Sequence, residues 1–176
     1  MGLEYRSLDQ QTRQIMLEEF NLDISSGNMY LSKRFNDFGE EYYVKAMPKH
    51  IMEGSDDTLA EDLKNNDCFK SHEERKNPKG GVTLAKIPET ACQTFAEGEF
   101  NRFYIRALSI RAATEGRPLQ IYRGRQSTNP RPESEALIGS NVNPGAILND
   151  LRENKGIDTV LGLPSGPNSG LTVNLI

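Results

Sequence analysis

Two cysteines, Cys68 and Cys92, and two histidines, His50 and His72, are the side chains of this 176-residue chain most suited to nucleophilic or metal chemistry. Their spacing gives neither a CxxC pair nor an HExxH motif, so no zinc shell is predicted. Cys68 and His72 could form a nucleophile–base pair with a carboxylate. However, both lie in or beside a Lys/Glu-rich stretch that lacks the rigid scaffold such catalysis needs. The sequence therefore predicts no enzyme, no cofactor and no metal.

A second group of polar residues comprises Arg123, the Ser127-Thr128 pair, Glu133 and Glu135. Their order resembles the Arg, Ser-Thr-Ser and Glu-x-Glu elements of ADP-ribosyltransferases. In that family the elements sit on separate strands spread over most of a domain. Here they fall within 14 residues that also contain two prolines, so we do not expect that active site. The paired acids suit contacts with Arg or Lys.

Arginines concentrate in the middle of the chain, where Arg102 and Arg106 lie one helical turn apart and Arg123, Arg125 and Arg131 follow. One interpretation is phosphate contact with a nucleic acid. The other is pairing with acids, either within the chain or between subunits. The pI of about 5.3 favours pairing, and no nucleic-acid motif is present, so sequence-specific nucleic-acid binding is not expected.

Charge is distributed unevenly along the chain. Residues 1–60 carry a net charge of −5, residues 70–131 a net charge of +6 and residues 132–176 a net charge of −3. Acidic and basic sections of one chain can attract each other in two ways. They either form head-to-tail contacts between copies or neutralise each other within one fold. No stretch approaches the roughly 18 apolar residues that would span a bilayer, so no membrane association is expected.

The first half of the chain predicts helices. Apolar spacing predicts one helix over about 8–20 and a second that begins at Asn36 or Asp37 and ends or kinks at Pro48. Ser55 is the expected cap of a short acidic helix. The polar residues 66–81 show no period and predict a surface loop.

The middle section predicts a strand at 82–87, a long helix from Pro88 to Thr114, and a strand at 119–122. Gly116 is the expected left-handed stop of this helix. The apolar residues of its strongest part, 99–114, recur at steps of three and four, which indicates one buried face. A helix between two strands suits a small βαβ-like unit.

The residues after Tyr122 predict a different organisation. Asn143-Pro144 is typical of a helix start, with an N-cap followed by proline at the first helical position. Gly and Pro dominate residues 162–170, which cannot order themselves by helix or sheet propensity. The last residues alternate apolar and polar like an added strand. Whether this arm docks on its own domain or on a neighbour is left open by the sequence.

Together these patterns predict an α+β fold: a predominantly helical small domain with short strands and an extended C-terminal arm. We expect an acidic helical section at 1–65, a charged loop at 66–81, a strand–helix–strand core at 82–122 and the arm, with one short helix, at 123–176.

Four segments carry a resemblance to a known family: 99–106, Tyr122-Arg123, 129–139 and 161–171, the last with the sequence LGLPSGPNSGL. They are similar to a family of uncharacterised virion structural proteins of tailed bacteriophages and prophages. The resemblance covers roughly the C-terminal half. It implies a component of the head or of the head–tail junction, located in the virion after assembly in the host cytoplasm, and it implies no catalytic residue.

The resulting hypothesis is a phage structural protein that docks on capsid, portal or neck subunits and on copies of itself, clamping neighbours with its C-terminal arm. The alternative is a phage-encoded regulator or anti-defence protein that binds a host protein. The residues expected to contact partners are Arg102, Arg106, Arg123, Arg125, Arg131, Glu133, Glu135, Leu161, Leu163, Leu171, Val173 and Ile176.

Overall fold

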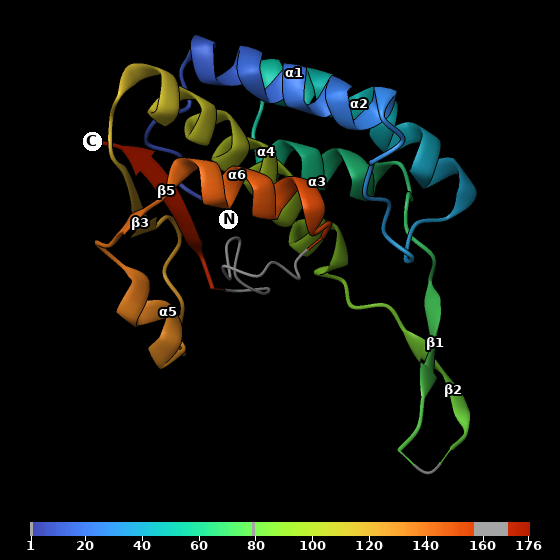
Figure 1. The fold of residues 1–176 in the computed structure, drawn as a ribbon. Helices are drawn as coiled ribbons and strands as arrows, with labels where there is room; N and C mark the ends of the chain where they lie inside the picture. Colours follow the sequence, from blue (N-terminus) through green and yellow to red (C-terminus); the bar gives the residue numbers. More distant parts are fainter. Residues whose placement is uncertain (1, 79, 157–168) are drawn as a thin grey trace.

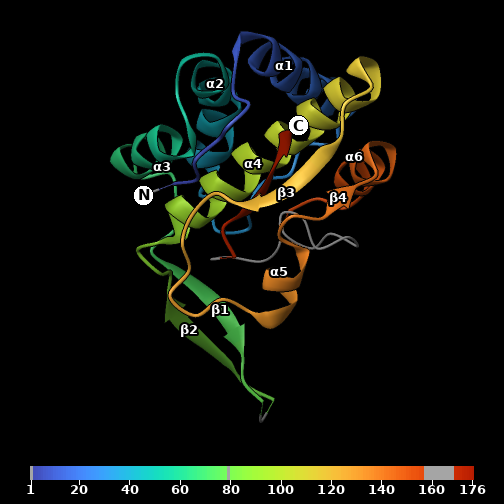
Figure 2. The same ribbon diagram turned by 90° about the vertical axis from the view of Figure 1, so that its left-hand side faces the viewer.

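The computed structural model describes residues 2–78, 80–156 and 169–176. These residues form six helices and two small antiparallel sheets, so the predicted α+β class is confirmed. Helices pack around a central helix, a three-stranded sheet covers one end, and a two-stranded hairpin extends away from the body (Figure 1). The view from the side shows the same separation between hairpin and body (Figure 2).

The central helix is α4, Ala91–Glu115. Gly116 ends it with a φ of 65°, the left-handed conformation that glycine adopts without a Cβ clash, as expected from the sequence. Three helices, α1 (Gln10–Ser25), α3 (Asp56–Asn65) and α6 (Pro144–Glu153), and two strands, β3 (Leu119–Arg123) and β5 (Leu171–Leu175), all contact α4. Because neighbours surround it, α4 buries polar as well as apolar positions, and the expectation of a single buried face was too narrow.

Side-chain caps define the starts of the first three helices. Helix α1, Gln10–Ser25, is capped by Asp9, whose carboxylate accepts from the amide of Thr12 at 2.9 Å. Asn36 caps α2, Asp37–Glu53, at the predicted place. Ser55 caps α3, Asp56–Asn65, through a reciprocal capping box. Each cap satisfies amide groups that have no partner inside the helix.

Helix α2 does not end at Pro48, which lies inside it. A proline in a helix interior loses one backbone hydrogen bond and costs about 3 kcal/mol. Beyond it, Ile51 is fully buried and His50 nearly so, with imidazole bonds to Asp62 and Thr58. We attribute the continuation of α2 to the burial of this last turn.

The three-stranded sheet has the order β4-β3-β5 and is antiparallel throughout. Its strands are β3, Leu119–Arg123, β4, Asn141–Val142, and β5, Leu171–Leu175. Ile121 in the middle strand lies opposite Val173 of β5. The C-terminal strand β5 therefore docks on its own chain.

The hairpin consists of β1, His72–Lys76, and β2, Val82–Lys86. Two predictions were wrong here. The segment 66–81 is not wholly a loop, since it contains β1, and β2 pairs with β1 rather than with β3 in a βαβ unit. The strand was not predicted because β1 is entirely polar. Without a buried face, its residues do not alternate between apolar and polar, which is the pattern that indicates a strand.

Two short helices complete the described chain. Helix α5, Pro132–Leu137, carries proline in its first turn, and α6, Pro144–Glu153, is capped by Asn143 as expected. Ile147 and Leu151 of α6 are fully buried, and α6 packs on α4. Within the described ranges, no helix is both long and apolar enough to cross a membrane.

Candidate functional site

The most exposed apolar side chains of the described chain lie on the β1–β2 hairpin. Val82 retains 61% and Leu84 69% of its accessible surface. Both side chains project from the same face of β2, because alternate residues of a strand point to the same side. Across the hairpin, Lys76 lies opposite Val82 and Glu74 opposite Leu84. The hairpin thus presents an apolar pair bordered by charges.

The backbone of β2 is also unpaired along its outer edge. Two backbone bonds flank the ladder, from Asn77 N to Gly81 O at 2.6 Å and from Ile87 N to Ser71 O at 3.0 Å, and they fix its hydrogen-bond pattern. Hydrogen-bonded pairs alternate with non-bonded pairs in an antiparallel ladder, so the amide and carbonyl groups of residues 82, 84 and 86 point outward. Such an edge can accept a strand from another chain.

The base of the hairpin is fixed to the helical body by an ion pair. Arg34 donates from Nε and Nη2 to the two carboxylate oxygens of Glu73, at 2.7 and 2.9 Å. Arg75 donates to the same carboxylate. Hydrogen bonds from both guanidinium groups lower the pKa of Glu73 to about 2. Because Glu73 and Ala85 occupy the face opposite to Val82 and Leu84, this anchoring leaves the apolar pair free.

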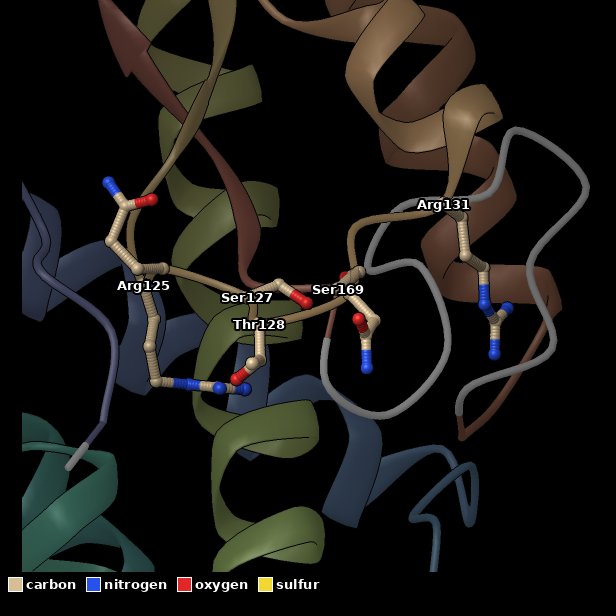
Figure 3. A pocket seen from close by; sticks show the side chains of 7 residues that line it. Arg125, Ser127, Thr128, Arg131 and Ser169 are labelled. Atoms are coloured by element: carbon tan, nitrogen blue, oxygen red, sulfur yellow. The ribbon is translucent and has the colours of Figure 1, made fainter.

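A polar cavity of about 400 Å³ lies at the other end of the molecule, beside β3 (Figure 3). Ser127, Thr128 and Ser169 line it together with Arg125 and Arg131. Arg125 is already held by Glu97 through two bonds, of 2.9 and 3.1 Å, and its guanidinium group lies beside Thr128, apart from that of Arg131 (Figure 3). The two arginines therefore do not converge on one anion position.

Arg102 and Arg106 are corrections to the predicted partner-binding set, since both side chains are completely buried. Arg106 bonds to Glu19 from Nε at 2.7 Å and to Asp23 from Nη1 at 2.7 Å. Arg102 bonds to Glu99 at 2.8 Å and to Asp23 at 3.1 Å. These arginines join α4 to α1 inside the core. Pairing within the chain was one of the alternatives that the sequence left open, and the structure shows it.

Burial and ion pairing have opposite effects on the pKa values of Glu19 and Glu99 in this buried cluster. Burial alone would raise the pKa of Glu19, but hydrogen bonds and charge from Arg152 and Arg106 outweigh it and lower the pKa. Burial raises the pKa of Glu99 despite its pairing with Arg102. The cluster balances three guanidinium groups against the three carboxylates of Glu19, Asp23 and Glu99.

The remaining predicted polar residues divide into paired and exposed ones. Arg123 pairs with Glu135 of α5 and donates to the backbone carbonyl of Ser169 at 2.5 Å. Arg123 and Glu135 belong to two of the elements whose order resembled ADP-ribosyltransferases, and the structure joins them as an ion pair. Arg131, the residue before α5, and Glu133, in the first turn of α5, are exposed.

The apolar residues predicted for the arm fall into three groups. Leu171 and Val173 are almost completely buried in β5, which pairs with β3 and packs against α4, so these two predicted contacts with a neighbour are wrong. Ile176 keeps 47% of its surface exposed. Leu161 and Leu163 lie outside the described residues. The clamp proposed for the arm is therefore not supported at β5, where the strand completes the sheet of its own chain.

The cysteines and histidines are engaged in structural contacts. Burial raises the pKa of the Cys68 thiol to about 11, so it is protonated near neutral pH and a poor nucleophile. Both nitrogens of the His50 ring are bonded, to Thr58 and Asp62. Among the residues that the structure describes, no group of three or more His, Cys, Asp or Glu side chains is placed to hold a metal ion.

Sequence reasoning did not single out Val82 and Leu84 as contact residues. A signal was present in the turn-forming run Asn-Pro-Lys-Gly-Gly at 77–81, which precedes the alternating residues of β2. Two segments flanking such a turn indicate a hairpin even when one of them is polar.

Comparison of the chain with protein-family models, with curated proteins and with solved structures found no match. The functional assignment therefore depends on the geometry of the hairpin and on the residue patterns of the sequence.

Proposed function

We propose that the protein is a structural component of a tailed-phage virion that docks on capsid or neck subunits through the β1–β2 hairpin. The observation that carries the docking step is the exposure of Val82 and Leu84 on a hairpin that projects from the body. The virion setting is supported by the resemblance of residues 99–106, 129–139 and 161–171 to phage structural proteins.

A partner surface would give the hairpin the apolar packing that it lacks by itself. Two-stranded hairpins are marginally stable in water by themselves, because they have no core to pack against. Here both strands are largely exposed, and only Glu73 and Ala85 are partly covered. A subunit that covers Val82 and Leu84 and pairs with the β2 edge would bury apolar surface and satisfy the outward amides. β-strand addition of this kind combines backbone affinity with side-chain specificity.

The experiment replaces both apolar residues by threonine, V82T/L84T, and counts copies of the protein in purified virions by quantitative mass spectrometry. Threonine retains the β-branched preference for strands while removing much of the apolar contact. Thr83→Ser, on the opposite face of the same strand, is the matched control. We expect wild-type protein and the control at a constant copy number per particle, and the double variant reduced at least about tenfold, as for loss of an interface hot spot.

Two results would overturn this assignment. Absence of the wild-type protein from purified virions would favour the regulator or anti-defence alternative. Normal incorporation of V82T/L84T, with a correctly folded hairpin, would mean that another surface docks the protein.

A further inference from the structure

A second exposed apolar group lies at the start of α2. Phe38 retains 55% of its surface, and its ring packs on Tyr42 with centroids 5.4 Å apart. Tyr42 is in turn fixed by its hydroxyl, which donates to Asp62 at 2.9 Å. Because its base is anchored, this aromatic pair offers a contact surface whose ordering costs little side-chain entropy.

Carboxylates outnumber basic groups around the start of α2. Asp37, Glu40 and Glu41 are exposed in its first turns; Glu41 lies one turn from Phe38 and pairs with Lys45 at 3.5 Å. Asp67 adjoins the start of α2, because the Asn36 side chain donates to its carbonyl at 2.7 Å. The surface around Phe38 is therefore acidic.

The hairpin segment has the opposite charge. Residues 70–87 contain five Lys or Arg and two Glu: Lys70, Arg75, Lys76, Lys79 and Lys86 against Glu73 and Glu74. Glu73 is shared by Arg34 and Arg75, so the charges of the segment that this pairing leaves for contact are the four lysines against Glu74. The chain thus carries a basic surface with two exposed aliphatic residues and an acidic surface with an exposed aromatic pair.

We infer that the hairpin of one copy docks on the Phe38 surface of a second copy, with Val82 and Leu84 covering the Phe38–Tyr42 pair. The inference rests on the proposed role of the hairpin as an interface and names its partner as this same chain. Lysines of the hairpin then face the carboxylates of α2, which fixes orientation and speeds association. The two surfaces are different, so copies can join in a chain or ring, or exchange hairpins reciprocally in a dimer.

Sedimentation velocity of the full chain at concentrations up to about 100 μM tests this contact, a range that detects the micromolar affinities of small interfaces. Wild-type protein is expected to self-associate more strongly at low salt, since the charges are exposed. V82T/L84T and F38A should each weaken self-association at least about tenfold. Leu22→Ala, at an exposed apolar residue of α1, should leave it unchanged.

The decisive sample is an equimolar mixture of V82T/L84T and F38A. Each variant retains the surface that the other lacks, so the mixture should form a heterodimer through one intact contact although neither variant associates alone. Undiminished self-association of F38A would overturn the inference in favour of symmetric hairpin–hairpin pairing. Failure of the mixture to associate, or a monomeric wild-type protein, would also overturn it.

These outcomes are separable from the proposed docking on virion subunits. If only the self-contact is wrong, F38A is incorporated into particles normally while V82T/L84T is not. If the hairpin has no docking role, both variants are incorporated normally and neither changes the sedimentation of the chain.

Discussion

Replacing Arg106 by methionine should destabilise the protein more than any loss of a surface ion pair. The Arg106 guanidinium contacts Glu19 and both carboxylate oxygens of Asp23 and is completely buried. Methionine fills a similar volume without charge. Asp23 then keeps one bond, from Arg102 at 3.1 Å, and Glu19 keeps its bonds to Arg152.

The magnitude follows from the burial of the residues left behind. Removing one partner of a buried ion pair costs about 3–5 kcal/mol, because the remaining charge is uncompensated in a medium of low dielectric. Arg152 pairs with the same Glu19, but 36% of its side chain is exposed. Arg152→Met should therefore cost less, near the roughly 1 kcal/mol of a surface pair.

Urea unfolding followed by circular dichroism measures both variants. With a slope of about 2 kcal/mol/M, the Arg106→Met midpoint should fall by roughly 2 M relative to wild type. The deficit should shrink as the pH falls toward 4. Arg106 helps to lower the pKa of Glu19, so its loss raises that pKa, and protonation of Glu19 then removes buried charge that destabilises the variant.

A second variant separates the two contributions to the cost of Arg106→Met, the uncompensated charge and the altered packing. Adding Asp23→Asn and Glu19→Gln to Arg106→Met should recover part of the lost stability, since no uncompensated carboxylate remains at those positions. If Arg106→Met costs no more than Arg152→Met, or if its deficit does not depend on pH, the buried cluster does not stabilise the α1–α4 contact as argued.

Three further substitutions probe other parts of the fold. Leu171→Ala should cost about 2–5 kcal/mol in urea unfolding, because Leu171 is buried within β5, where this strand pairs with β3 of its own chain; a neutral effect would contradict docking of β5 in cis. Asp56→Asn should flatten the pH dependence of stability. Burial raises the pKa of Asp56 to about 7, so the stability of the wild-type protein falls as the pH rises from about 4 through 7. An unchanged slope of stability against pH in the variant would refute this. Gly39→Ala should lower the thermal midpoint sharply, since its Cβ would lie 2.0 Å from the Cys68 carbonyl oxygen, and a wild-type midpoint would show that this approach is looser.

Local signals in the sequence located several helix boundaries. The Asn36 and Asn143 caps and the Gly116 stop depend on a few neighbouring residues, and each lies where it was predicted. Of the two outcomes predicted for Pro48, an end or a kink, the end does not occur: the local cost of about 3 kcal/mol is outweighed by burial of the following turn, a tertiary effect that no local pattern contains.

The candidate site was harder to predict than the helices. The run from Glu99 to Arg106 indicates a helix, but not that acids of α1, almost 80 residues earlier, would surround its arginines. In the same way, the alternation at Leu171 and Val173 predicted a strand correctly without identifying the chain on which it docks. Local patterns determine the type of an element, whereas its partner depends on contacts between distant residues.

The charged residues of the chain fall into two groups: those paired inside the fold and those left at the surface. Arg102, Arg106 and Arg111 of α4 neutralise Asp23, Glu19 and Asp9 in and beside α1, so much of the opposite charge is paired within one molecule. What this pairing leaves at the surface is the basic hairpin and the acidic start of α2, each beside exposed apolar side chains. Neutralisation within the fold and contact between copies are thus compatible, because different residues carry them. Substitutions in the buried cluster should change stability, whereas substitutions at Val82, Leu84 and Phe38 should change association with little effect on unfolding.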